Sequence, residues 1–243
     1  MRTIAFFFLV MCFFSCVKTE KNRKQKPNII YILADDLGYG ELGAYGQEKI
    51  RTPNLDRLSD QGMRFTQHYT GAPVCAPSRY MFLTGNHAGH AYIRGNYELG
   101  QFSDEMEGGQ MPIPESTPTL AKMLKKAGYQ TAMVGKWGLG MNTTTGSPLL
   151  QGFDYYYGYL DQKQAHNYYP THLWENDEKV PLNNDYFLVH KPIQSKSSQE
   201  DFDQFKGKDY APDRMLEKAV HFLNTTAADT PFFLYYPSPI PHV

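Results

Sequence analysis

Residues 28–36 decide the fold, and they read NIIYILADD. Residues 28–34 form a short apolar, β-branched run, which is typical of a strand buried on both faces of a sheet. The run stops at Asp35-Asp36, and glycines follow at positions 38, 40, 43 and 46. Because glycines at this density favour a loop, we expect the two carboxylates to stand where a buried strand gives way to a loop.

Helix and strand patterns alternate along the rest of the chain. The expected helices are 54–61, a segment bracketed by Thr117 as N-cap, Pro118 in the first turn and Gly128 after the end, and 212–224, and the expected strands are 64–69, 129–134 and 232–236. This alternation predicts an α/β fold, with a parallel or mixed sheet and helices on both faces. Residues 138–210 are irregular, aromatic and polar, and we expect an insertion that shapes a pocket.

Polar residues follow several of the predicted strands. Asp35-Asp36, Lys136 and Pro241-His242 each come directly after one, and Cys75 follows the predicted strand 64–69. In sheets of this kind, ligands bind at the carboxyl ends of the strands. We therefore expect these residues to converge on one rim of the sheet.

Cys75 begins the segment 75–79, which reads CAPSR and continues as YMFLTG. The other two cysteines, Cys12 and Cys16, lie in an N-terminal apolar stretch, so Cys75 is the only thiol in the body of the protein. A lone cysteine is reactive, modified, or small and buried. The adjacent proline, hydroxyl and fixed positive charge, at the expected start of a helix, argue against simple burial. Arg79 follows one helical turn later and would share a face with Cys75.

Each charged group has both an ordinary and a chemical interpretation. Asp35-Asp36 is either a solvated turn or a pair of hard oxygen ligands for calcium or magnesium. Arg79 offers a fork of donors to a tetraoxo anion or a carboxylate. Lys136 is a second cation or a surface lysine, and His242 is a proton donor, an oxyanion contact or a capping histidine. Together they describe a metal and two cations around one nucleophile, which is how an enzyme handles a sulfate or phosphate ester.

The N-terminus has the pattern of an export signal. Residues 4–14 are almost wholly apolar but too short to span a bilayer, and a basic run covers 18–26. Ser15-Cys16 resembles the end of a bacterial lipoprotein signal, with an uncleaved membrane anchor as the rival interpretation. We expect residues 1–26 to be a signal and basic linker, and the protein to be exported, to the periplasm or as an outer-membrane lipoprotein of a bacterium.

Composition limits the class of partner. Lys and Arg together number 24 against 25 Asp and Glu, so no broad electrostatic surface for nucleic acid is expected. The length allows the core of one domain. Tyrosines cluster between Tyr155 and Tyr169. Such aromatic faces with hydroxyls suit sugar or aryl recognition, although they also occur in packed loops.

The segment CAPSR at 75–79, with LTG at 83–85, resembles the signature of the type I sulfatases. In that family the cysteine is oxidised after synthesis to formylglycine, and the positions of Pro77 and Arg79 belong to the core recognised by the modifying enzyme. Asp35-Asp36 matches the family's first metal-binding pair, Gly135-Lys136-Trp137 its GKWHLG motif, and Pro241-His242 its later proline-histidine. The resemblance runs from about Pro27 to the last residue and implies a truncated alkaline-phosphatase-like fold.

This resemblance implies hydrolysis of sulfate monoesters through a formylglycine made from Cys75. Its hydrated aldehyde carries two hydroxyls on one carbon, one to attack sulfur and the other to expel sulfate afterwards. Arg79 and Lys136 would neutralise the sulfate oxygens. His242 would contact the sulfate or assist protonation of the leaving group.

The resemblance also implies cofactors and partners. A divalent metal, calcium in preference to magnesium, would be held by Asp35, Asp36 and the residue made from Cys75. The substrate would be a sulfated small molecule or glycan, and a formylglycine-generating or sulfatase-maturating enzyme would act on the chain. No nucleic acid is expected, and a membrane only through a lipid anchor or signal.

Two departures from the family pattern stand out. Position 138 is glycine where the motif carries histidine, and His166 and His172 are candidates to replace that imidazole or to select substrate. The Asp-Asn pair that completes the family's metal site and a further sulfate-contacting lysine are not found, since 183–185 lie in the wrong context. We therefore expect residues 27–243 to be the incomplete N-terminal part of a catalytic domain, and whether this part is active alone stays open.

Three functions stay open on these residues. The leading one is hydrolysis of a sulfated carbohydrate or an aryl sulfate outside the cytoplasm. The second is a phosphoesterase or phosphonate hydrolase of the same superfamily, because the scaffold serves both anions. The third is a fragment that binds sulfated glycans without turning them over.

Overall fold

The computed structural model describes residues 26–103, 106–189, 192–194 and 196–242, so the expected export signal lies outside the described residues, except for Lys26. Within the described residues, one sheet has the strand order β1-β6-β2-β3-β4-β5. Its strands are β1 (Ile29–Asp35), β2 (Gln130–Lys136), β3 (Tyr155–Tyr159), β4 (His172–Glu175), β5 (Glu178–Pro181) and β6 (Phe232–Pro241). The α-helices are α2 (Pro53–Gln61), α3 (Cys75–Thr84), α4 (Leu120–Lys126), α5 (Gln199–Asp203) and α6 (Ala211–Thr225), with short 3-10 turns at Tyr39–Glu41, Gly43–Tyr45 and Gln164–His166.

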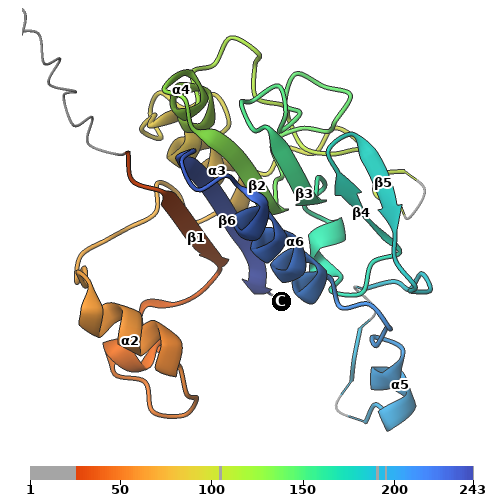
Figure 1. Cartoon of the computed structure of the whole chain (residues 1–243). Helices are drawn as coiled ribbons and strands as arrows, with labels where there is room; N and C mark the ends of the chain where they lie inside the picture. The colour runs from red at the N-terminus through yellow and green to blue at the C-terminus, as the bar shows by residue number, and fades with distance from the viewer. Residues whose placement is uncertain (1–25, 104–105, 190–191, 195, 243) are drawn as a thin grey trace, which may run out of the picture.

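The sheet is mixed and covered on both faces, as expected. β1, β6, β2 and β3 are mutually parallel, whereas β4 and β5 run antiparallel. Helix α6 packs its apolar stripe against one face, and α3 and α4 pack on the other (Figure 1). The stripe of α6 follows helical spacing, because Met215, Ala219 and Phe222 fall on one side of the helix.

The expectation that the first strand is buried on both faces was wrong. Tyr31 and Leu33 pack against the core that contains α3, but Ile30 is 50% exposed and Ile32 64% exposed. The reason is position: β1 is an edge strand of the described sheet, and α6 lies over β2, β3 and β6 instead (Figure 1). The apolar run therefore predicted the strand correctly, but not which elements cover its two faces.

Two local expectations were also wrong. Residues 64–69 form no strand, and Phe65 and Tyr69 are mostly exposed. An apolar alternation becomes a strand only where a ladder partner accepts its hydrogen bonds, and the described sheet pairs other segments. The N-cap of α4 is Thr119 and not Thr117, because the Thr119 hydroxyl accepts a hydrogen bond from the Lys122 amide.

The segment 138–210 was expected to be an irregular insertion, and this was wrong for much of it. It supplies β3, β4 and β5, which form half of the sheet. Tyr156, Tyr157 and Tyr159 are buried in the core. Their phenol rings pack against neighbouring elements, so the tyrosines of β3 serve the fold.

Within the described residues, no helix has the length and apolar character needed to cross a bilayer.

Candidate active site

Three parallel strands deliver polar residues to one edge of the sheet. β1 ends at Asp35, β2 ends at Lys136, and β6 ends at Pro241 directly before His242. Because β6 lies between β1 and β2, their carboxyl ends meet. The Lys136 ammonium lies 2.7 Å from the Asp35 carboxylate although 101 residues separate them. The expected convergence on one rim is confirmed for these side chains.

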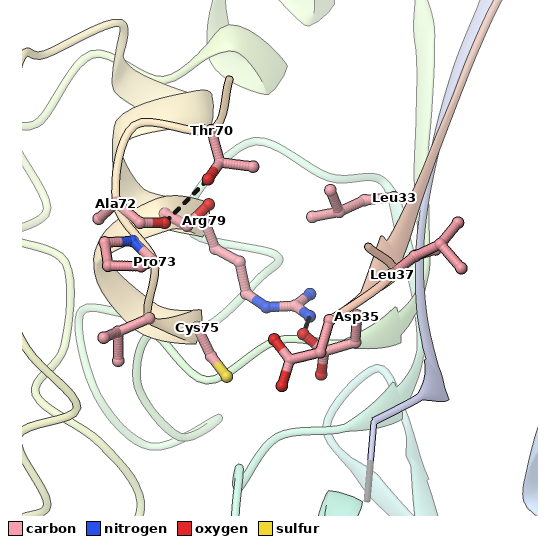
Figure 2. A pocket seen from close by; sticks show the side chains of 12 residues that line it. Leu33, Asp35, Leu37, Thr70, Ala72, Pro73, Cys75 and Arg79 are labelled. Carbon is pink, nitrogen blue, oxygen red and sulfur yellow. Dashed lines mark hydrogen bonds and ion pairs between the residues drawn. The ribbon is translucent and has the colours of Figure 1, made fainter. Parts of the chain in front are cut away.

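Helix α3 brings the thiol to the same edge. Cys75 is the first residue of the helix, and Arg79 follows one turn later on the same face. Figure 2 shows both side chains reaching from α3 toward Asp35 across a pocket of about 170 Å³. That volume has room for a tetraoxo anion and a few waters, since one water occupies about 30 Å³ in the liquid.

Asp35 organises the two cations of the site. Its Oδ1 accepts from Arg79 at 3.0 Å and its Oδ2 from Lys136 at 2.7 Å, with all three side chains at most 7% exposed. Arg79 Nη1 also donates to the Lys136 carbonyl oxygen at 2.7 Å. Burial acts to raise the pKa of Asp35, but Arg79 and Lys136 outweigh it and hold that pKa below its usual range. The carboxyl is therefore ionised at neutral pH.

The cations outnumber this carboxylate and reach the thiol. Lys136 Nζ lies 3.5 Å from Cys75 Sγ. Arg79 Nε is buried without a hydrogen-bond partner among the described residues. Two positive charges against one buried carboxylate, with a donor left over, make this pocket suited to an anion beside Cys75.

His242 and Asp36 form the outer side of the group. Asp36 has φ +59°, a left-handed conformation that Asp tolerates, and its side chain is mostly exposed. His242 Nε2 lies 3.5 Å from the Asp36 carboxylate, and its Nδ1 is buried without a described partner. Ligand atoms of Asp35, Cys75 and His242 all lie within 4.8 Å of one another.

The structure brings His166 to this group but not His172. The rings of His166 and His242 have centroids 4.7 Å apart. His172 instead lies buried in β4, where its Nε2 is 2.5 Å from Glu107 Oε1. Trp174 Nε1 donates to both oxygens of the same Glu107 carboxylate. His172 thus belongs to a separate buried network.

Comparison with known proteins places the chain. The model of the sulfatase family matches residues 27–243. The chain belongs to the sulfatase family. It is 34% identical to human N-acetylgalactosamine-6-sulfatase over 228 residues, which cover 87% of this chain and 39% of that protein. Human arylsulfatase D is 44% identical over 138 residues, covering 55% and 23% respectively.

Solved structures share the fold. The structure of a protein in complex with its substrate D-glucosamine-2-N,6-O-disulfate matches with a TM-score of 0.63 and 27% identity, covering 89% of this chain and 35% of that one. The sheet and its helices therefore have the α/β architecture of the alkaline-phosphatase-like fold. The chain spans less than two fifths of the length of these three relatives.

Sulfatases generally use a divalent metal and a formylglycine, and the donor set here fits a divalent cation. The carboxylates of Asp35 and Asp36 are hard oxygen ligands, and a ring nitrogen of His242 lies within 4.8 Å of ligand atoms of Asp35 and Cys75. A thiol is a soft ligand that suits calcium poorly. Oxidation of Cys75 to an oxygen-bearing group would replace this soft ligand with a hard one beside the two carboxylates.

Gly138, where the sulfatase motif carries histidine, has a structural reason to stay glycine. Its φ is +74°, and a Cβ there would approach Gln162 Cγ and Nε2 to 2.4 Å. Gln162 Nε2 donates to the Gly138 carbonyl oxygen at 3.2 Å. Gln162 thus occupies the space that a side chain at 138 would need. Nothing in the sequence marked Gln162, because its importance depends on a contact across 24 residues.

Proposed function

We propose that this chain is part of an enzyme that hydrolyses sulfate monoesters of a carbohydrate or an aryl alcohol, through a formylglycine made from Cys75. The observation that carries the proposal is the contact of Lys136 Nζ with Cys75 Sγ in a pocket that also contains Asp35 and Arg79. A nucleophile position beside two buried cations suits attack at the sulfur of an anionic ester.

The residues of this chain have distinct roles in that chemistry. When formed, the hydrated formylglycine supplies two hydroxyls on one carbon, one for attack at sulfur and one for release of sulfate. Arg79 and Lys136 bind the sulfate oxygens and neutralise their charge. Asp35 holds both cations in place through separate oxygens, so the anion meets a preorganised site.

Two imidazoles serve the proton transfers. His242 faces the thiol position and carries the proton toward the leaving oxygen. His166, adjacent to it, takes the place of the imidazole that Gly138 lacks. Asp35, Asp36 and the residue made from Cys75 would hold the metal, calcium in preference to magnesium, which would add a further positive charge at the sulfate.

Relatives support the substrate class. One is named an N-acetylgalactosamine-6-sulfatase, and another was solved with a disulfated glucosamine. We extend to this chain a sulfated substrate, maturation by a formylglycine-generating enzyme, and export to the periplasm or as a lipoprotein.

The test uses the full-length protein purified from its natural host. Peptide mass spectrometry over residues 75–79 should find the aldehyde, and turnover of an aryl sulfate should exceed that of the matched aryl phosphate. An unmodified thiol together with no sulfate release would contradict the proposal. Preferred turnover of the phosphate would favour a phosphoesterase, and glycan binding that persists without metal or hydrolysis would favour a binding protein.

A further inference from the structure

Tyr235 lies in a row of side chains beneath helix α3. Tyr31 of β1 and Met133 of β2 both pair in register with Tyr235 of β6. On the next strand, Tyr156 of β3 pairs with Met133. Side chains in register on parallel strands point to the same face of the sheet, and all four pack in the core that also contains residues of α3. The phenol of Tyr235 therefore points toward α3.

Arg79 and Phe82 project from one side of α3 onto this row. They are three residues apart, so their side chains are neighbours on the helix surface. The centroid of the Phe82 ring lies 5.2 Å from that of Tyr235 and 4.0 Å from that of Tyr31, on which it stacks. Arg79 is fully buried. It therefore lies between α3 and the part of the sheet that carries Tyr235.

The Tyr235 hydroxyl is buried within reach of this guanidinium. Burial raises the pKa of Tyr235 to about 12, whereas the positive charge of Arg79 and a hydrogen bond from its side chain act in the opposite direction. The phenol is therefore neutral at physiological pH. No group among the described residues meets full hydrogen-bond geometry with its hydroxyl. Tyr235 thus offers an acceptor close to Arg79 but off the line of its N–H bonds.

Arg79 has N–H groups to spare for this acceptor. A guanidinium carries five N–H donors. Nη2 of Arg79 uses one on Asp35, and Nη1 uses one on the Lys136 carbonyl oxygen. A buried hydroxyl without a partner is unfavourable, which favours its alignment with one of the remaining N–H groups. Because the phenol is neutral, it can hold the orientation of the guanidinium without cancelling the positive charge that an anion needs.

We propose that Tyr235 is a positioning residue of the sulfate site, whose hydroxyl accepts a hydrogen bond from the Arg79 guanidinium and holds that cation beside Cys75. Tyr235 does not touch the substrate and acts only through Arg79. The hydrogen bond aligns when an anion draws Arg79 into the pocket, so it stabilises the occupied site more than the empty one. The proposal rests on the proposed function, because it assumes that Arg79 binds the sulfate of an ester at Cys75.

The experiment removes the hydroxyl and keeps the ring, with Tyr235→Phe in the full-length enzyme. We expect kcat/KM on 4-nitrophenyl sulfate to fall about tenfold, on the scale of one hydrogen bond to a charged group. The inhibition constant of inorganic sulfate should rise by a similar factor, because the lost contact acts on the anion-bound state.

Tyr156→Phe is the matched control. Tyr156 lies in the same row, and its hydroxyl is also buried without a partner among the described residues. Burial raises the pKa of Tyr156 well above its usual value, and the charge of Glu107 raises it further, ahead of any effect of Arg79. Its hydroxyl therefore belongs to the surroundings of Glu107, and its removal should change both constants by less than about twofold.

A second background separates positioning from a merely structural role. In an Arg79→Lys enzyme, Tyr235→Phe should lower kcat/KM by less than about twofold, because the lysine ammonium lacks the fork that reaches the hydroxyl. A tenfold loss in both backgrounds would overturn the positioning role. So would a lower unfolding midpoint of Tyr235→Phe with both constants unchanged.

Binding separates these results from failure of the proposed function. If the full-length protein releases no sulfate from any ester, calorimetric titration with inorganic sulfate still tests Tyr235. Tyr235→Phe should then weaken sulfate binding at least about threefold, and Tyr156→Phe should leave it unchanged. Sulfate binding that is absent, or equal in Tyr235→Phe and wild type, would overturn the proposal independently of catalysis.

Discussion

Asp35 and Glu107 are both buried carboxylates in contact with basic side chains. They differ in what else those side chains contact. Asp35 meets Arg79 and Lys136, and Lys136 extends further to Cys75. Glu107 meets His172 and Trp174, with Lys179 at 3.3 Å. The first group holds two permanent cations for one carboxylate beside a nucleophile. The second surrounds its carboxylate with donors, and no nucleophile among the residues that the structure describes is recorded in contact with it.

The comparison shows what marks a site in this fold. Burial of charge alone is common to both groups and, in general, contributes little net stability. The difference lies in surplus donors and in the residue they reach. At Asp35 the surplus is aimed at Cys75, whereas at Glu107 the donors end on the carboxylate itself.

The largest expected effect is a loss of activity on removing Cys75, the residue that the Asp35 group contacts and the Glu107 group does not. Cys75→Ala in the full-length enzyme should lower kcat by about 10⁴- to 10⁶-fold, as loss of a nucleophile generally does. The unfolding midpoint should move by only a few degrees, because one small side chain is removed. Sulfate release and thermal unfolding measure the two quantities. Activity above a tenth of wild type would place the nucleophile elsewhere.

The second effect is a loss of stability, without a comparable loss of activity, on changing Glu107. Glu107→Gln should lower the free energy of unfolding by about 3 kcal/mol, because a single amide oxygen replaces a buried carboxylate that contacts both His172 and Trp174, and a buried donor is left unpaired. The kcat/KM of the folded fraction should stay within about threefold of wild type. Denaturant unfolding and initial rates provide the readings. Asp203→Asn is the control, since the exposed pair with Lys206 should cost below about 1 kcal/mol.

The opposite result for Glu107→Gln would contradict the separation of the Glu107 group from the Asp35 group. A large loss of activity with unchanged unfolding would make Glu107 and His172 part of the substrate site. It would also restore the sequence-based hypothesis for His172, which the geometry places in the separate network.

The sequence predicted the edge of the sheet that carries the candidate site better than the rest of the sheet, for a physical reason. Asp35, Lys136 and His242 each follow a strand, and parallel strands bring their carboxyl ends together regardless of the intervening chain. Strand ends are local signals that the residues themselves carry. The convergence therefore needed only the strand positions and their direction.

The predictions that failed concerned which strands pair in the sheet and which elements pack against them. Residues 64–69 have the alternation of a strand but no described partner, whereas 155–159 belong to the segment expected to be an irregular insertion and lie inside the sheet. Exposure of Ile32 depends on where α6 packs. Gln162 matters through its contact with Gly138, which no local pattern reveals.

A smaller effect on the free energy of unfolding is expected at Gly138, two residues after Lys136 of the Asp35 group. Gly138→Ala should cost about 1–3 kcal/mol, from the left-handed backbone and from the 2.4 Å approach to Gln162. Adding Gln162→Ala should recover the steric part and leave the backbone part. A double-mutant cycle by denaturant unfolding measures this coupling. Strict additivity would mean that Gln162 does not occupy the space beside position 138.

The smallest effect concerns the dependence of stability on pH. Burial acts to raise the pKa of Glu107, but the hydrogen bond and charge of His172, with Trp174 and Lys179, hold it below its usual range. A lowered pKa in the folded state means that the unfolded chain binds more protons as the pH falls. The stability that Glu107 contributes is therefore full above its unfolded pKa of about 4.3 and is lost as the pH falls through the folded pKa. Between those values one carboxyl contributes at most about 1.4 kcal/mol per pH unit. Unfolding free energies measured from pH 6 to pH 3 should therefore fall less steeply in Glu107→Gln than in wild type, and equal slopes would mean that Glu107 titrates alike in both states.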